Sequence, residues 1–473
     1  MLLRSIVASC LLLLATAPVR LLHTQRIWGQ PPSAVQSGAA RQFSGRASES
    51  AGRSEFVYTL AKSYEPLAWM QGGERFPSGA ALFIKDAKGQ RPLLPDFASS
   101  ADPVVSFDGQ RILFAARTHP ADPWQIWELS LNGGPARRIT SGPEDCIRPF
   151  YLPDDRVVYA RKIAGRFVIE ALDLSGGKPL PLTPSPASAI PSDILRDGRI
   201  LFSAGYPLGT GDSPEIYTVY SDGSGVESYR CDHGAPRHSA KQNVSGDLIF
   251  VSAKGLGRFT SARAQGLRLE APVGEFAGDF AETTNGEWLV SWRPDSNSPF
   301  RIMRWQQGSE RMESVIVEQG TNILQPTLIA ARAMPNRHPS GLHDWPNANL
   351  LCLNAYTSKY TFAAGSIHSI RVYTLDGDNR AKLLGSAPVE SDGSFFVQVP
   401  GDQPLQIELL DASGKTLKRE SGFFWMRGGE QRGCVGCHAG PETAPENAVP
   451  AVLLKSTTPA DLTGNAHTSS GGH

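Results

Sequence analysis

The residues with the most specific chemistry lie near the C-terminal end of the chain, where Cys434, Cys437 and His438 form a C-x-x-C-H motif. Two thiols at this spacing can form thioether bonds to the vinyl groups on one edge of a porphyrin. The adjacent imidazole can then serve as a ligand to the iron. The motif therefore predicts one covalently attached c-type haem, with His438 as the proximal iron ligand.

Two other chemistries use a C-x-x-C pair, namely redox dithiols and zinc sites. The sequence contains no second C-x-x-C pair that would complete a four-cysteine zinc site. A redox dithiol is expected within a β-α-β unit, whereas the residues around Cys434 are typical of strands and loops. Haem attachment is therefore the preferred interpretation.

The second axial ligand of the iron is not fixed by the motif. Met426 is one candidate, because it lies shortly before Cys434 and a thioether ligand raises the potential of a c-type haem. Open, five-coordinate iron is the alternative. Further candidates are four histidines: His343, His368, His467 and His473. The aromatic run 423–425, directly before Met426, is expected to face the porphyrin on one side and the core of its own domain on the other.

Two histidine clusters could also bind a metal ion. They are residues 231–233 with His238, and His338 with residues 343–344. Both lie in Pro/Gly-rich segments, where polar side chains commonly bond to the backbone instead. The sequence lacks the motifs of zincin proteases, α/β hydrolases, P-loop nucleotidases and dinucleotide dehydrogenases. No catalytic residue can be assigned.

The segment before the motif is built from repeats. Each unit has a short strand, a polar turn and a second β-rich strand, and the units recur every 40–48 residues or so, which is typical of propeller blades. The units are 102–117, 147–162, 191–205, 239–253 and, more weakly, 281–292. We therefore predict an N-terminal β-propeller over residues 55–337 with about six blades. It should close into a ring, because an open array would expose a strand edge.

A second β region follows the propeller. Strand-like runs between Leu350 and Lys418 alternate with turns at Asp376–Gly377, Asp392–Gly393 and Ser413–Gly414. This pattern predicts a small antiparallel β sandwich or barrel, within a domain spanning residues 338–440 that ends in the haem motif. The chain as a whole is thus predicted to be mainly β.

The N-terminal region, residues 1–30, has the features of an export signal. Arg4 precedes an apolar run, and Ala15–Ala17 is a small-x-small cleavage pattern. Export to the periplasm also agrees with the expected place of haem attachment. Residues 31–54 and 441–473 are small and polar, which predicts a flexible spacer and a disordered tail.

The composition restricts the partners. Lys+Arg and Asp+Glu both total 46, which argues against a nucleic-acid partner. No segment after the signal region is apolar over the length that a spanning helix needs, so no transmembrane span is expected in the mature chain. The partner of a periplasmic haem protein would be an unidentified redox or other protein.

Two family resemblances add to these interpretations. The unit Pro103–Thr140 resembles the blades of TolB-type propellers. The runs LLCLNAYTS, GSIHSIRVY and RGGEQRGCVGCH, between Leu350 and His438, resemble the middle domain of hydrazine synthase alpha subunits. In that family a propeller precedes a β domain that ends in a c-type haem motif. The resemblance implies a periplasmic haem protein with Cys434 and Cys437 as attachment points.

Three functions remain open. The first is electron transfer, with the propeller as a docking platform. The second is a haem enzyme that acts on a small nitrogen or oxygen species, similar to hydrazine synthase. The third is a propeller binding module with an accessory haem.

Overall fold

A computed structural model describes residues 55–230, 232–262, 267–269, 271–316, 318, 320–436 and 447–464. The predicted signal region 1–30 and spacer 31–54 lie outside the described residues, as do Cys437 and His438. Strands dominate the described part, so the predicted mainly β class is confirmed. The described helices are short, and none of them is long and apolar enough to cross a membrane.

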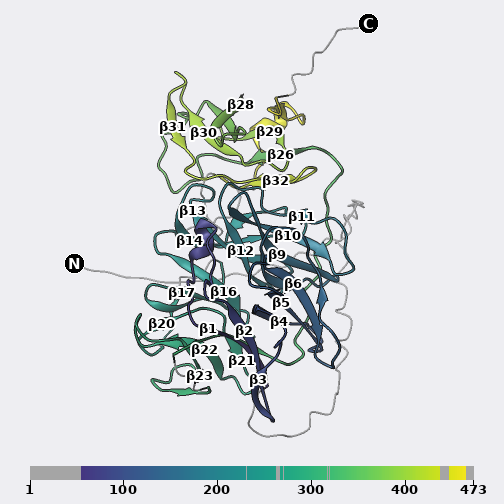
Figure 1. Cartoon of the computed structure of the whole chain (residues 1–473). Coiled ribbons are helices and arrows are strands. Elements are labelled where there is room, and N and C mark those ends of the chain that lie inside the picture. Colours follow the sequence, from purple (N-terminus) through teal and green to yellow (C-terminus); the bar gives the residue numbers. More distant parts are fainter. Residues whose placement is uncertain are drawn as a thin grey trace, which may run out of the picture. The chain divides into compact units, whose positions relative to one another are not determined.

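Six sheets of the described chain form the blades of a propeller (Figure 1). Blade 1 contains β25 (Asn322–Leu328), β1 (Phe56–Ala61), β2 (Ala80–Asp86) and β3 (Gly89–Pro92). Blade 2 contains β4 (Ser99–Val105), β5 (Arg111–Arg117), β6 (Gln125–Ser130) and β7 (Arg137–Arg138). Blade 3 contains β8 (Cys146–Tyr151), β9 (Arg156–Ile163), β10 (Arg166–Asp173) and β11 (Leu180–Pro181).

The other three blades follow along the chain, and blade 6 has a fifth strand. Blade 4 contains β12 (Ala189–Ile194), β13 (Ile200–Tyr206), β14 (Ser213–Val219) and β15 (Glu227–Ser228). Blade 5 contains β16 (Arg237–Gln242), β17 (Leu248–Ser252), β18 (Gly255–Phe259) and β19 (Leu267–Arg268). Blade 6 contains β20 (Glu275–Phe276), β21 (Ala281–Glu282), β22 (Trp288–Arg293), β23 (Arg301–Trp305) and β24 (Met312–Ser314).

The ring is closed by strands from the two ends of the propeller. β25 pairs antiparallel with β1, so blade 1 combines the first and last strands of the region. The innermost strands contact one another in succession, β4 with β8, β8 with β12, β12 with β16, and β25 with β4. This closure removes the exposed edge that an open array would have. The predicted repeats coincide with the first two strands of blades 2 to 5 and with β21 and β22 of blade 6.

The second β region is a sandwich of two four-stranded sheets. One sheet has the order β32 (Gln431–Cys434), β26 (Asn347–Cys352), β29 (Phe395–Pro400) and β33 (Ala460–Asp461). The other has the order β28 (Ala381–Pro388), β27 (Ser369–Leu375), β30 (Gln406–Leu410) and β31 (Thr416–Arg419). Alternate residues of β26 and β29 are buried in the shared core. The predicted sandwich is confirmed, but it is not wholly antiparallel, because β32 and β33 pair in parallel with β26 and β29.

The predicted disorder of residues 441–473 is wrong for residues 447–464. This segment forms α1 (Ala451–Lys455) and β33, and the backbone N–H groups of Ala451 and Val452 donate to Asp392 and Ser394. Leu462 is buried in the sandwich core. A short polar segment can be ordered in this way when a neighbouring sheet offers an unpaired edge and space for one apolar side chain.

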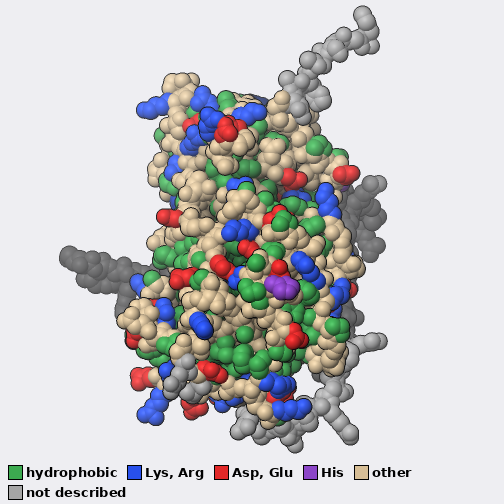
Figure 2. All heavy atoms as spheres, in the orientation of Figure 1, with side chains coloured by type: hydrophobic (Ala, Val, Ile, Leu, Met, Phe, Trp, Pro, Cys, Tyr) green, Lys and Arg blue, Asp and Glu red, His purple; other side chains and the backbone are tan. Residues whose placement is uncertain are grey.

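The surface carries both signs of charge. On the face shown in Figure 2, Lys and Arg side chains are interspersed with Asp and Glu. This mixture agrees with the equal numbers of basic and acidic residues in the sequence, and it gives no sign of a basic surface for nucleic acid on this face.

Candidate functional site

The first cysteine of the C-x-x-C-H motif is held by a strand of the sandwich. Cys434 is the last residue of β32, and its position pairs with Cys352 at the end of β26. The backbone N–H of Leu353 donates to the carbonyl of Cys434 at 2.8 Å. Cys434 is half-buried against the sandwich core, whereas Cys352 is fully buried. The start of the motif is therefore rigidly placed, although Cys437 and His438 lie outside the described residues.

The glycine of the motif is required by close packing. A Cβ atom at Gly436 would lie 2.1 Å from the carbonyl oxygen of Thr357 and 2.8 Å from that of Asn354. Backbone atoms this close cannot be accommodated without a shift of one segment. The motif is thus pressed against the connection between β26 and β27, residues 353–368.

This connection carries two aromatic residues that sequence reasoning missed. Tyr356 and Phe362 are half-buried against the same core as Cys434. The Tyr356 hydroxyl accepts the backbone N–H of Ile367 at 3.1 Å, which holds the connection folded. These aromatic side chains are far from Cys434 in sequence, and no sequence motif indicates that they pack against the same core.

The run before the motif joins the two regions. Trp425 is buried in the apolar cluster of blades 3 and 4, and its indole Nε1 donates to the carbonyl of Gly223 at 3.1 Å. The backbone N–H of Phe423 donates to the carbonyl of Leu208 at 2.7 Å. Met426 instead lies in the sandwich core. Phe424 packs against both clusters, so the run has one side toward the propeller and one toward the core of its own domain. The contact with a porphyrin stays a prediction.

The axial-ligand candidates differ in their surroundings. Met426 is fully buried among apolar side chains of the sandwich, so its sulfur could reach iron only from inside this core. His343 stacks on Trp345 with ring centroids 4.7 Å apart, and His368 is exposed. His467 and His473 lie outside the described residues. The roles of Met426 and of His438 as iron ligands stay predictions.

The proposed histidine clusters are engaged in other contacts. His233 stacks on Tyr206 with ring centroids 3.8 Å apart, and His338 stacks on Tyr220 at the same separation. Burial lowers the pKa of His238 to about 4, so this imidazole is neutral near pH 7. Among the residues that the structure describes, no group of three or more His, Cys, Asp or Glu could hold a metal ion. Cys231 lies outside them.

A second polar site, not predicted from the sequence, occupies the centre of the propeller. The innermost strands bulge there, and residues other than glycine adopt positive φ angles: Asp102 (58°), Arg148 (54°), Ser239 (51°), Asp279 (43°) and Gln325 (57°). Such backbone is strained and is found more often at functional sites. The repeat periodicity predicted these strands but could not show the bulges.

The bulged residues form a buried network of charges. Arg148 donates two hydrogen bonds to Asp279, at 2.7 and 3.0 Å, and Arg75 pairs with Asp102. The Nε2 of Gln325 donates to Asp102 at 2.6 Å. Burial alone would raise the pKa of Asp102 and of Asp279, but the neighbouring arginines outweigh it and lower both pKa values. Both carboxylates therefore remain charged.

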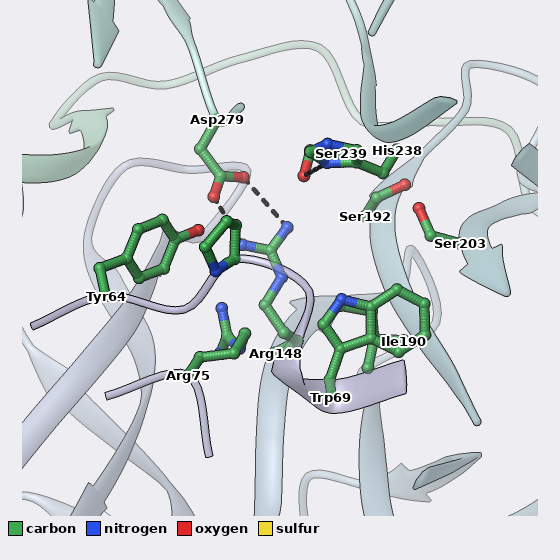
Figure 3. A pocket seen from close by; sticks show the side chains of 11 residues that line it. Tyr64, Trp69, Arg75, Arg148, Ile190, Ser192, Ser203, His238, Ser239 and Asp279 are labelled. Carbon is green, nitrogen blue, oxygen red and sulfur yellow. Dashed lines mark hydrogen bonds and ion pairs between the residues drawn. The ribbon is translucent and has the colours of Figure 1, made fainter. Parts of the chain in front are cut away.

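A small cavity lies inside this network (Figure 3). Its volume is about 10 Å³, which is room for roughly one water-sized molecule. The hydroxyl groups of Ser192 and Ser203 line it together with the indole of Trp69. The Ser203 hydroxyl is buried and has no hydrogen-bond partner in the described part of the chain. The centre of the ring is thus polar but too small for a larger ligand.

Together, the fold and the motif define a class of protein in which a six-bladed propeller is followed by a β sandwich whose strand β32 begins a C-x-x-C-H motif. Residues 355–439 match the family described as hydrazine synthase alpha subunit middle domain. Over these residues the chain is similar to that family, which confirms the resemblance drawn from the sequence.

The comparisons with individual proteins agree. Hydrazine synthase subunit alpha from Kuenenia stuttgartiensis is 32% identical over 77 residues, which cover 16% of this chain and 10% of that protein. The solved structure of Kuenenia stuttgartiensis hydrazine synthase aligns with a TM-score of 0.74 and 17% identity, over 85% of this chain and 72% of that chain. At this identity the alignment shows a shared fold. TolB from Acinetobacter baumannii aligns with a TM-score of 0.37 and 17% identity, over 71% of this chain and 77% of that chain.

Proposed function

We propose that this chain is an exported haem enzyme that acts on a small nitrogen or oxygen species, as a relative of hydrazine synthase. One observation carries the proposal: the family match over 355–439 spans the complete C-x-x-C-H motif and most of the sandwich that holds it. The matched part covers a tenth of the curated relative, so the activity of that whole protein is itself part of the proposal.

The described residues fit a covalently attached haem. Cys434 ends a strand and keeps part of its side chain exposed, so a porphyrin could approach its sulfur without unfolding the sheet. The packing of Gly436 fixes the chain between the two cysteines. In the proposal, Cys434 and Cys437 hold the haem, while His438 is the candidate iron ligand. When bound, the haem supplies an iron centre for redox chemistry and for binding a small molecule.

The chain's own contribution would be to orient this group and to limit access of water. Tyr356 and Phe362 are partly buried against the same core as Cys434, and they could supply apolar surface to cover a porphyrin face. The contacts of Trp425 and Phe423 hold the segment before the motif against the propeller. The propeller would thus act as a rigid support, and a partner protein could dock on it.

The ligation state of the iron tests the proposal. The full chain would be produced with a cytochrome c maturation system, and its absorption spectrum would be recorded with and without carbon monoxide or nitric oxide. We expect a high-spin spectrum and rapid binding of either gas to the reduced haem, because an enzyme needs an open coordination position. A low-spin, six-coordinate spectrum that neither gas changes would contradict the proposal and favour electron transfer.

A further inference from the structure

The connection between β1 and β2 is unusually long for a propeller hairpin. It spans residues 62–79, contains the short 3₁₀ helix η1 (Ala68–Gln71), and buries Trp69 and Arg75. A Cβ atom at Gly72 would lie 1.8 Å from the carbonyl oxygen of Gly165, so the connection is pressed against the turn between β9 and β10. Long ordered connections of this kind are commonly functional.

A cavity of about 140 Å³ lies between this connection and blades 2 and 3. Its wall combines cations with aromatic rings: Arg75, Arg117, Lys162, Phe76, Trp124 and Phe167. The volume is close to that of an engineered cavity of roughly 150 Å³ that binds benzene. The cavity can therefore hold a ring-sized molecule, in contrast to the smaller cavity at the centre of the propeller.

The carboxylates around this cavity already have partners. Glu74 accepts from Arg117 at 2.6 Å and from the indole Nε1 of Trp124 at 2.8 Å. Asp102 pairs with Arg75, and Asp145 accepts the backbone N–H of Trp124 at 3.0 Å. The carboxylate groups that line the cavity thus already accept hydrogen bonds from donors of the protein.

Several donors, in contrast, are left over. The Nε atoms of Arg75 and Arg117 have no hydrogen-bond partner in the described part of the chain, but they are buried from the cavity as well. Lys162 is half-buried and makes no ion pair with the described residues. A carboxylate in the cavity would accept a charge-assisted hydrogen bond from this ammonium group.

We propose that this cavity is a binding site for a small carboxylate with a compact apolar group. The carboxylate would accept from Lys162, while the apolar group would pack on Phe76, Trp124 and Phe167. The site is separate from the C-x-x-C-H motif, so the inference does not depend on the proposed function.

Benzoate is a suitable probe, because it carries a carboxylate on a single ring. Isothermal titration of the full chain with benzoate should give saturable binding with one site. Benzamide has nearly the same shape but no charge, and it should bind at least tenfold more weakly if charge-assisted hydrogen bonds hold the ligand. Absence of saturable benzoate binding, or equal affinity for benzamide, would overturn the proposal.

Two lysine variants locate the site. Lys162→Met should weaken benzoate binding by about three- to tenfold, since it removes one partly exposed cation. Lys178→Met changes an exposed lysine outside the cavity and should leave the affinity unchanged. Circular dichroism of both variants would show that the fold is kept. Benzoate binding that is insensitive to Lys162→Met would place the ligand elsewhere and refute the assignment.

Discussion

His238 provides a quantitative test of the buried network in the propeller. The side chain lies beside the central cavity, and its Nδ1 is 3.0 Å from the hydroxyl of Ser239. Burial lowers its pKa from 6.5 to about 4, although the charge of Asp279 acts in the opposite direction. The folded protein therefore keeps the imidazole neutral at a pH where the unfolded chain already binds a proton.

These two pKa values determine how the free energy of unfolding changes with pH. The stabilising contribution is fully present above the unfolded value of 6.5 and is lost as the pH falls toward 4, because only the unfolded state takes up a proton in this range. Linkage gives a loss of about 2 kcal/mol in the free energy of unfolding between pH 7 and pH 5. Substitution by glutamine keeps hydrogen-bonding capacity but cannot be protonated in this range.

The assay compares wild type with His238→Gln. Urea unfolding followed by circular dichroism would be measured at pH 7 and at pH 5 for both proteins. Other groups contribute equally to the two pH dependences, so their difference isolates His238, and the variant should lose about 2 kcal/mol less than wild type on acidification. Identical pH dependences would refute a buried neutral imidazole at this position.

Three further substitutions test the segment around the motif. Gly436→Ala should destabilise the fold by about 1–3 kcal/mol and lower the haem content per chain, because its Cβ would clash with the carbonyl of Thr357. Gly433→Ala serves as the control, because a Cβ at that position meets no neighbouring atom. Trp425→Ala should cost about 3–5 kcal/mol in urea unfolding, and a smaller loss would mean that its contact with the propeller contributes little. Met426→Leu should change the free energy of unfolding by less than about 1.5 kcal/mol. If the iron is five-coordinate, the Soret band should stay unchanged. A shifted band would identify Met426 as the axial ligand.

The fold could be predicted to a large extent because its signals are local and repeated. The turns at Asp108–Gly109 and Asp197–Gly198 join the first two strands of their blades, as their positions in the repeats indicated. The closing pair of β25 with β1 followed from the general need to cover a strand edge. Segment 447–464 was missed because its order depends on the exposed edge of β29 and on burial of Leu462, which its composition does not show.

Of the candidate site, only the residues of the C-x-x-C-H motif could be predicted from the sequence. Cys434 could be identified from its spacing. No sequence pattern indicates that Tyr356 and Phe362 pack against the same core, or that their connection lies against Gly436. The same holds for the cavity beside Lys162, since it forms where a hairpin connection from blade 1 meets blades 2 and 3. The contact of Trp425 with the propeller was not predicted, because strand alternation indicates opposite faces but not what lies on each face.

Covalent attachment of haem is the central claim, and its most direct test is an intact-mass measurement of the denatured chain produced with a cytochrome c maturation system. Thioether bonds survive unfolding, so we expect the mass of the chain plus one haem, matched by a haem-stained band on a denaturing gel. The variant Cys434→Ala with Cys437→Ala should show the mass of the polypeptide alone and no stain. A wild-type chain without the added mass, or a double variant that keeps it, would contradict the account.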